Sequence, residues 1–400
     1  MLGFSVVSLG LVILLLISLF ALTGSSESPA LFAWRVLDLG SNSNSYVTAY
    51  SVAGWNVTEI GITGTYVDAG HGQEFFKGVV FNNNLVFWRV INSTNFAITA
   101  LSLSNYAFKD VFNFTSPVGA VSSQWAPTDM EIIDNTVFAV YGYAAFPTYN
   151  TTIIESGDLS TWTQYCVSNT VFAESIEQYT GPGFLNGILE YGGYRSDGGG
   201  TYAVINAWNS TGGSEISLFS GTIWGSDDVC YMKMFNSTCM IAGDAFPYNV
   251  LYTNDGQNWT DPHITGSYSL QYLFDWGWNI EIRDGSAYIT AEPYDVDIAH
   301  GGLVKWNNTS VPFDYDLTIE SIANGLIGGC EGLYNIGLAD FPGVASVYQY
   351  NLDGTIGPLI WKSTYTGSVS NLIYDPADAA WYGLILRRTN PQSVTVIMIQ

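Results

Sequence analysis

The sequence predicts an all-β body built from a repeated unit and preceded by one N-terminal apolar helix. After residue 40, short runs rich in aromatic and β-branched residues alternate with Gly, Asn, Asp and Pro, which is typical of strands and turns. Aromatic and acidic residues also recur at intervals of about fifty residues, the length of one blade of a β-propeller. A seven-bladed β-propeller is therefore the favoured fold. Six or eight blades, a β-sandwich array and a right-handed β-helix are the alternatives.

The N-terminal run covers residues 2–23, which carry no charge and are rich in Leu, Val and Ile. As a helix it would span roughly 33 Å, enough for the ~30 Å hydrocarbon core of a bilayer. It lacks the basic start and the small-x-small cleavage site of a removed signal peptide. We expect a membrane anchor at residues 1–24 in contact with the lipid bilayer, a linker at 25–32 and a propeller ectodomain at 33–400. A cleaved signal and a pilin-like assembly helix are the alternatives.

The charge balance excludes one class of partner. The chain has 35 Asp and Glu against 11 Lys and Arg, a formal net charge of −24. Nucleic-acid binding needs clustered cations, so no nucleic-acid partner is expected. In strong acid the carboxylates lose their charge and few cations remain to repel one another. The composition resembles that of surface proteins of thermoacidophilic archaea and their viruses, and we expect the body to be extracytoplasmic, on a cell surface or virion envelope.

The positions of the cysteines and of possible N-glycosylation sites also suit a location outside the cytoplasm. Four cysteines allow two disulfides in any of three pairings. Cys230 and Cys239 flank a predicted hairpin turn and are the disulfide candidate, and for Cys166 and Cys330 buried free thiols are the alternative. Nine Asn-x-Ser/Thr acceptors are spread along the body and predict a glycosylated surface: Asn56, Asn92, Asn113, Asn150, Asn209, Asn236, Asn258, Asn307 and Asn308.

The repeat is clearest in three acidic positions. Asp158, Asp255 and Asp353 follow one another at spacings of 97 and 98 residues, and each comes after a Phe-Pro pair and a predicted strand. Half of that spacing is one repeat unit. Three predicted strands near the C-terminus lack a fourth, which residues 30–65 can supply to complete the ring.

Two of these Asp residues lie in a recognisable motif. Residues 156–162 read SGDLSTW and residues 253–259 read TNDGQNW, which resemble the Asp-box of BNR-repeat β-propellers. In such a turn the Asp accepts backbone N–H bonds, the Gly takes a positive φ and the Trp packs between strands. In the family these boxes are structural, so the resemblance implies a fold and no activity. The expected structural residues are Ser156, Asp158, Trp162, Thr253, Asp255, Gly256, Trp259 and, in a looser copy, Asp353.

The resemblance also raises the question of catalysis, because many Asp-box propellers are sialidases. Such a site implies three arginines around a substrate carboxylate. The Arg-Ile-Pro signature is absent, and Arg89, Arg195 and Arg283 fall in different expected blades. General glycoside hydrolysis needs two carboxylates facing each other across a pocket at the mouth of the ring. The glutamates on or beside predicted strands are interpreted as exposed strand-end residues: Glu74, Glu131, Glu190, Glu281 and Glu292.

We therefore predict no catalytic residue and no cofactor. The main candidate metal site is the loop carrying Asp295, Asp297 and His300, and Asp68, His71 and Glu74 form a second, looser group; hard ligands of this kind would suit Ca²⁺. A solvated acidic turn is the alternative.

Binding is the favoured interpretation. Residues 191–200 are expected to form a flexible aromatic loop, and residues 274–279 place two indoles between blades. Aromatic faces beside Asp and Asn suit sugar rings, although packing between blades is the alternative for each Trp. The predicted function is surface recognition or adhesion toward surface glycans or other surface proteins, or a structural role in a cell envelope or virion; an extracellular glycan hydrolase and a pilin-like filament subunit are the alternatives. The candidate ligand-binding residues are Tyr191, Tyr194, Arg195, Asp197, Trp276 and Trp278.

Overall fold

The protein is described from a computed structural model. The described residues are 31–38, 57–65, 78–92, 95–115, 129–145, 148–182, 188–196, 201–209, 215–221, 229–244, 250–260, 276–283, 286–292, 302–306, 325–327, 343–350, 356–375, 377–378, 380–387 and 393–400. Within these segments, no helix is long and apolar enough to cross a membrane. The predicted anchor at residues 2–23 lies outside them.

Three consecutive sheets are four-stranded antiparallel meanders. The first contains β3 (Gly78–Phe81), β4 (Asn84–Asn92), β5 (Asn95–Ser102) and β6 (Phe108–Thr115). The second contains β7 (Asp129–Ile133), β8 (Thr136–Ala145), β9 (Thr148–Ser156) and β10 (Thr163–Ser168). The third contains β11 (Val171–Glu177), β12 (Ile188–Ser196), β13 (Thr201–Asn209) and β14 (Glu215–Ser220).

Two further sheets have three strands each within the described segments. One contains β15 (Val229–Met234), β16 (Met240–Asp244) and β17 (Val250–Thr253). The other contains β18 (Trp276–Arg283), β19 (Ser286–Glu292) and β20 (Gly302–Trp306).

The last sheet joins both ends of the described chain. Its order is β2-β25-β24-β23-β22-β1-β21. The 20-residue strand β23 (Ile356–Asp375) pairs with β22 (Gly343–Tyr350) through its first half and with β24 (Ala380–Arg387) through its second half. The N-terminal strand β1 (Leu31–Asp38) lies between β21 (Gly325–Ile327) and β22, and β2 (Val57–Thr65) pairs with the final strand β25 (Ser393–Ile399). Strands β1 and β2, which lie within residues 30–65, therefore pair with C-terminal strands, and β1 begins inside the predicted linker.

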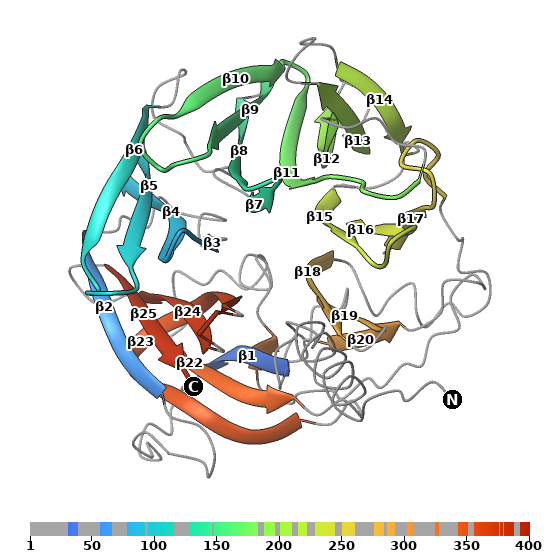
Figure 1. The fold of residues 1–400 in the computed structure, drawn as a ribbon. Helices are drawn as coiled ribbons and strands as arrows, with labels where there is room; N and C mark the ends of the chain where they lie inside the picture. Colours follow the sequence, from blue (N-terminus) through green and yellow to red (C-terminus); the bar gives the residue numbers. More distant parts are fainter. Residues whose placement is uncertain are drawn as a thin grey trace, which may run out of the picture.

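The sheets stand around a common centre, as in a β-propeller (Figure 1). The first strand of each meander is innermost, and the inner strands contact one another in order: β3 with β7, β7 with β11, β11 with β15, and β15 with β18. Strand β23 contacts β3 on the other side. The prediction of an all-β protein is confirmed, and the arrangement brings residues far apart in sequence to one central place.

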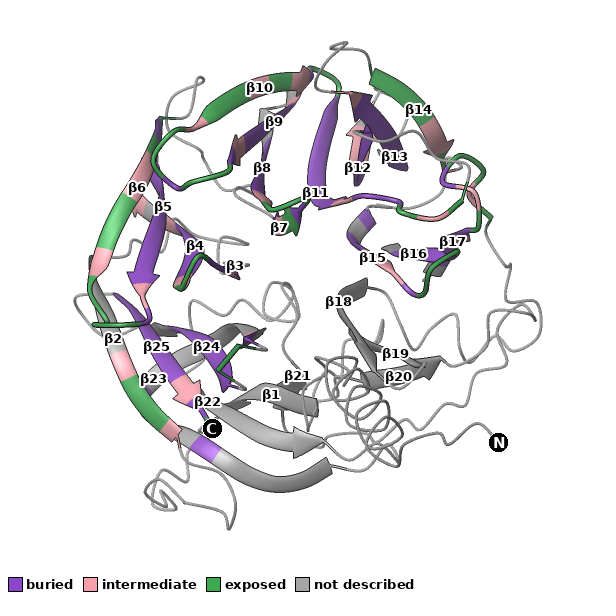
Figure 2. Cartoon of the chain, in the orientation of Figure 1, coloured by how far each residue is buried: buried purple, intermediate pink, exposed green. Residues whose placement is uncertain are grey.

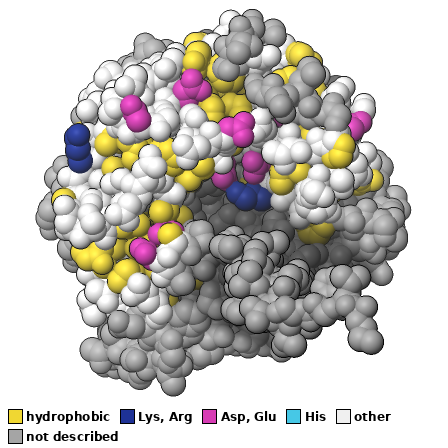
Figure 3. Space-filling model, viewed as in Figure 1, with side chains coloured by type: hydrophobic (Ala, Val, Ile, Leu, Met, Phe, Trp, Pro, Cys, Tyr) yellow, Lys and Arg dark blue, Asp and Glu magenta, His cyan; other side chains and the backbone are white. Residues whose placement is uncertain are grey.

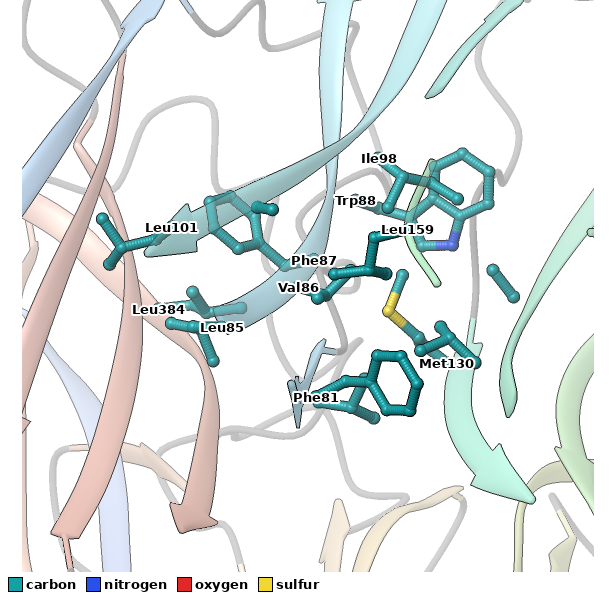
Figure 4. Packing of buried hydrophobic residues seen from close by; sticks show 14 of the residues in the cluster. Phe81, Leu85, Val86, Phe87, Trp88, Ile98, Leu101, Met130, Leu159 and Leu384 are labelled. Carbon is teal, nitrogen blue, oxygen red and sulfur yellow. The ribbon is translucent and has the colours of Figure 1, made fainter. Parts of the chain in front are cut away.

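Burial follows the position of each strand. Strands in the middle of a sheet are packed on both faces by neighbouring sheets, so β4 and β5 carry nearly continuous apolar runs. The outer strands β6, β10 and β14 are largely exposed (Figure 2). Figure 4 shows the packing between the first two sheets, where Trp88 and Leu85 of β4 and Met130 of β7 belong to one buried cluster with Leu384 of β24.

The predicted disulfide between Cys230 and Cys239 is wrong. The pairing of Met234 with Met240 places Cys239 beside Phe235, five residues along β15 from Cys230. That is roughly 16 Å of extended strand, whereas disulfide Cα atoms lie within about 7 Å. Cys239 is a buried free thiol, and burial raises its pKa to about 11.

Candidate functional site at the inner strands

Residues 156–162 and 253–259 form two turns with the same hydrogen-bond pattern. In each, the Asp carboxylate accepts hydrogen bonds from the N–H groups two and three residues further on, at 2.7–2.9 Å. The hydroxyl two residues before the Asp accepts from the N–H group three residues after itself, at 2.9 and 3.0 Å. The residue after the Asp has a positive φ in both turns, 60° at Leu159 and 68° at Gly256. The same local structure therefore occurs twice.

These hydrogen bonds make the two carboxylates acceptors for the backbone. Bonds from the N–H groups of Thr161 and Ser160 lower the pKa of Asp158 to about 2. Burial opposes the shift at Asp255, but the hydrogen bonds from Asn258 and Gln257 lower its pKa to about 2 as well. A carboxylate held in this way remains ionised and is not available as a proton donor. The third copy, at Asp353, lies outside the described residues.

The tryptophans of the two turns pack toward neighbouring strands. Trp162 is half-buried, and its ring centroid lies 5.6 Å from that of Phe112 in the first sheet. Trp259 is half-buried against the apolar cluster that includes Leu251 of β17. Both indoles therefore contribute to packing.

Asp255→Ala is expected to destabilise the protein by about 1–2 kcal/mol, because two backbone N–H groups lose their acceptor, as in removal of a helix N-cap. The folded-state pKa is lowered, so the stabilisation is present above the ordinary pKa and is lost as pH falls from about 4 to about 2. Thermal melting of the full chain at pH 6 and pH 2 checks this. Equal differences between wild type and variant at both pH values would contradict it.

The segment predicted as a flexible aromatic loop is mostly a strand. Residues 188–196 form β12, which lies between β11 and β13. Tyr191 is 0% exposed and donates its hydroxyl hydrogen bond to Glu215, so it is a core residue and not an exposed sugar platform. Burial, and then the bond to Glu215, raise its pKa above the ordinary value.

The glycines of this segment serve close packing. A Cβ on Gly193 would lie 1.9 Å from the carbonyl oxygen of Phe172, and one on Gly192 would lie 2.4 Å from Cγ1 of Val229. The sequence suggests flexibility at these glycines, whereas the structure uses their lack of a side chain to bring strands together.

The other predicted ligand residues are not brought together within the described structure. Tyr194 stacks on Phe172 with ring centroids 4.9 Å apart. Arg195 donates a hydrogen bond to Ser220 at 3.1 Å and lies 5.7 Å from the ring centroid of Tyr202. Asp197, the side chains of Trp276 and Trp278 on β18, and the loop with Asp295, Asp297 and His300 lie outside the described part. Among described residues, no group of three or more His, Cys, Asp or Glu is placed to hold a metal ion.

The described arginines do not form the cluster that a sialidase requires. Arg89 of β4 bonds to Thr99 at 3.2 Å and forms an ion pair with Asp110 of β6. Arg195 lies in a different sheet with its own local partners. The side chain of Arg283 lies outside the described residues.

Several glycosylation acceptors are accessible. Asn113 on β6, Asn236 in the β15–β16 turn and Asn258 are exposed. The Nδ2 group of Asn258 donates to Asp255 at 2.7 Å. Asn150 and Asn209 are half-buried. The acceptors whose side chains lie outside the described residues are Asn56, Asn92, Asn307 and Asn308.

A charged cluster joins three inner strands at the centre. Lys233 of β15 contacts Glu131 of β7 at 2.9 Å and Glu177 of β11 at 3.8 Å. Their side chains are 37%, 23% and 13% exposed, respectively, so each retains access to solvent. Figure 3 shows a hollow at the centre of the ring with acidic and basic side chains gathered at its edge.

The electrostatics of this cluster are unusual. Burial raises the pKa of Glu177 to about 7, although the charge of Lys233 opposes the shift. Burial alone would lower the pKa of Lys233, but the charges of Glu131 and Glu177 raise it above the ordinary value. At neutral pH the cluster therefore holds a permanent ammonium group beside a carboxyl group that can take or release a proton.

Asp129 fixes the geometry beneath this cluster. It is buried, its Oδ1 accepts from the N–H of Met130 at 2.8 Å and its Oδ2 accepts from the N–H of Ile176 at 3.0 Å. The second bond runs from β7 to β11, so Asp129 ties two sheets together next to Glu131 and Glu177.

Sequence reasoning missed most of this cluster. The sequence pattern indicates only an exposed strand-end residue at Glu131, and it does not distinguish Asp129, Glu177 and Lys233 from other charged residues. One usable signal was their position: each lies on the first strand of its repeat, which is the innermost strand of a propeller.

The fold and the cluster define a class of protein, an all-β propeller with a charged site at its centre. Neither a family model nor a curated protein matches the sequence. Solved structures with a similar fold include a Trypanosoma rangeli sialidase in complex with the inhibitor DANA, at 12% identity and a TM-score of 0.46, covering 86% of this chain and 59% of that one. This chain thus spans less than two thirds of the sialidase.

Two other similar structures are matched over most of their own length. The β-propeller domain of the Trilobed protease from Pyrococcus furiosus is 10% identical, with a TM-score of 0.42, covering 80% of this chain and 92% of that one. U3-55K is 8% identical, with a TM-score of 0.48, covering 82% and 99%. Because these TM-scores lie below 0.5, the fold rests on the sheets and registers described above.

Proposed function

We propose that this protein is a membrane-anchored, extracytoplasmic β-propeller that recognises hydroxyl-rich ligands, above all surface glycans, at the centre of its ring. The contact of Lys233 with both Glu131 and Glu177 carries this proposal. The carboxylates accept hydrogen bonds, the ammonium group donates them, and all three groups are partly exposed beside one hollow. Sugar hydroxyls both donate and accept hydrogen bonds, so they suit such a site.

Seven blades are part of the proposal. The inner strands would be β3, β7, β11, β15, β18, β21 and the second half of β23, with β2 as the outer strand of the last blade. The pairing of β2 with β25 supports closure, since it covers strand edges that would otherwise be free. The two matching turns at Asp158 and Asp255 support their interpretation as Asp-boxes.

The location is proposed from the sequence. Residues 2–23 would anchor the chain in a bilayer, and exposed acceptors such as Asn113 and Asn236 are compatible with glycosylation outside the cytoplasm. The acidic, lysine-poor composition suits a cell surface or a virion envelope in an acidic setting. Within this proposal, the propeller ectodomain serves either in adhesion or as a structural component of the envelope.

Binding of the detergent-extracted full chain to an array of surface oligosaccharides tests the proposal. We expect Glu131→Gln and Lys233→Met to weaken binding to the recognised sugar at least about tenfold, because each removes a charge-assisted hydrogen bond worth roughly 1.5–3 kcal/mol. The matched control is Asp110→Asn, which breaks the ion pair with Arg89 in the first sheet and should leave binding unchanged.

If only Asp110→Asn lost binding, or if Glu131→Gln and Lys233→Met both bound normally, the ligand site would not be the central cluster. Thermal melting of each variant separates loss of a contact from loss of the fold.

Glycoside hydrolysis is the second candidate. The carboxylates of Glu131 and Glu177 lie no more than about 7 Å apart, because both contact one nitrogen, and that range includes the roughly 5–5.5 Å spacing of retaining glycosidases. A pKa of about 7 also suits Glu177 as a proton donor. Binding ranks first because Lys233 occupies the space between the two carboxylates. If the wild-type protein released sugar from the arrayed oligosaccharides and Glu177→Gln abolished that release, hydrolysis would be favoured instead.

A further inference from the structure

The contact between the β11–β14 sheet and the β15–β17 sheet encloses an unpaired carboxyl group. Glu190 of β12 is 0% exposed, and neither of its oxygens has a hydrogen-bond partner in the described structure. It pairs in register with Glu177 of β11, so the two side chains project from the same face of the sheet. Buried polar groups almost always have a partner, so this exception needs a physical explanation.

The surrounding contact is closely packed. The hydroxyl of Ser175 donates to the carbonyl of Val229 at 3.1 Å, which ties β11 to β15. The hydroxyl of Tyr179 lies 2.8 and 2.6 Å from two carbonyl oxygens, one in the β15–β16 turn and one in the turn at 253–259. Gly192, two residues from Glu190, lets Val229 approach so closely that a Cβ would not fit. A charge inside this contact would have little room for hydration.

The charged groups around Glu190 disfavour its ionised form. Burial raises its pKa well above the ordinary value, the indole N–H of Trp259 opposes the shift, and the negative charges of Glu177 and Asp255 raise the pKa further. Lys233 forms its ion pairs with Glu131 and Glu177, and none with Glu190 within the described structure. The titratable or charged groups on the packed elements include Asp129, Glu131, Glu174, Glu177, Tyr179, Tyr231, Lys233, Cys239, Tyr252 and Asp255.

We propose that Glu190 is a proton-operated switch in the contact between these two sheets. With its proton, Glu190 is a neutral buried side chain and the contact stays closed. When the proton leaves to solvent, a negative charge remains in the repulsive field of Glu177 and Asp255 with only the indole N–H of Trp259 to offset it, and β11 and β15 separate more readily. Glu177 lies on β11 and Lys233 lies on β15, so separation of these strands also disturbs the central cluster and its ligand site. This effect on ligand binding is the only part of the proposal that rests on the function proposed above.

The direction of the pH effect follows from the raised pKa. The stabilisation from neutral Glu190 is complete below the ordinary glutamate pKa of 4.5 and is lost as pH rises through the raised value. The switch is therefore closed in acid and open toward alkaline pH.

Hydrogen exchange of the full chain, followed by mass spectrometry from pH 4.5 to pH 8, tests the switch without any ligand. After correction for intrinsic rates, we expect backbone amide exchange in residues 171–179 and 229–235 of the wild type to depend on pH. The exchange rate should rise about tenfold for each pH unit between the ordinary glutamate pKa and the raised pKa of Glu190. Glu190→Gln and Glu190→Met should remove this rise. Glu155→Gln is the matched control, since Glu155 is a half-buried glutamate in the second sheet that accepts from Tyr165, and it should keep the wild-type profile.

A wild-type profile without pH dependence in these segments would overturn the proposal, even if neither variant folded. So would a rise that persists in both Glu190 variants, or one that disappears only in Glu177→Gln. Glycan binding is measured separately, so a failure of the switch and a failure of the central ligand site remain distinguishable.

Discussion

Gly193→Ala is expected to disrupt the β11–β14 sheet and to cost more than about 3 kcal/mol of unfolding free energy. The added Cβ would lie 1.9 Å from the carbonyl oxygen of Phe172 and 2.7 Å from Cα of Ala173, both of them backbone atoms of the paired strand. Backbone in a central sheet cannot move aside as a flexible side chain can, so β11 and β12 must separate.

Thermal melting of the full chain in detergent, followed by circular dichroism, measures this loss. Gly157→Ala is the matched control, because a Cβ at Gly157 would meet nothing within 4 Å. We expect the control to melt with the wild type and the Gly193 variant to melt far earlier or to fail to fold. Two variants with the same melting temperature would show that the close approach of β11 to β12 is wrong.

Trp88→Ala is expected to destabilise the protein by about 3–5 kcal/mol, the usual range for removal of a buried aromatic side chain. Trp88 of β4 is 0% exposed, and its indole N–H donates to the carbonyl of Asp129 at 3.4 Å. The variant would leave a cavity between the first two sheets (Figure 4).

Urea unfolding of the full chain at fixed detergent concentration gives this difference. Ile216→Ala on the outer strand β14 is the control, because its side chain is 54% exposed and should change stability by less than about 1 kcal/mol. A Trp88 variant as stable as this control would contradict the packing of β4 against β7.

The pKa shifts set opposite limits on stability. The carboxylates of Asp158 and Asp255 stabilise their turns only while ionised, so their contribution is lost between about pH 4 and pH 2. Glu190 contributes most when neutral, so its contribution is lost as pH rises above 4.5. The two effects together favour a moderately acidic optimum, in keeping with the acidic composition.

Local chemistry made part of the structure predictable. The strand content follows from short apolar runs between turn residues, and the turns at Asp158 and Asp255 depend on residues within three positions of the Asp. Local patterns failed at Tyr191 and Gly193, where the glycines suggested a flexible loop. Gly193 lies against Phe172 of β11, and Tyr191 donates to Glu215 of β14, and the segment itself reveals neither of these residues from other strands.

The central cluster was beyond local reasoning for the same reason. Lys233 and Glu131 are 102 residues apart in sequence and meet only because the first strands of successive sheets face one centre. Charged residues are scarce in this chain, yet scarcity alone did not distinguish Glu131 and Glu190 from exposed strand ends. The ring geometry is what turns dispersed residues into a site.

A side-chain-resolution structure of the full-length protein with its best-bound oligosaccharide would test the central claim most directly. We expect Lys233 to contact both Glu131 and Glu177 and the sugar to lie in the central hollow within hydrogen-bonding distance of that cluster. A sugar bound on an outer strand or a side of the ring, with Lys233 apart from both carboxylates, would contradict the account.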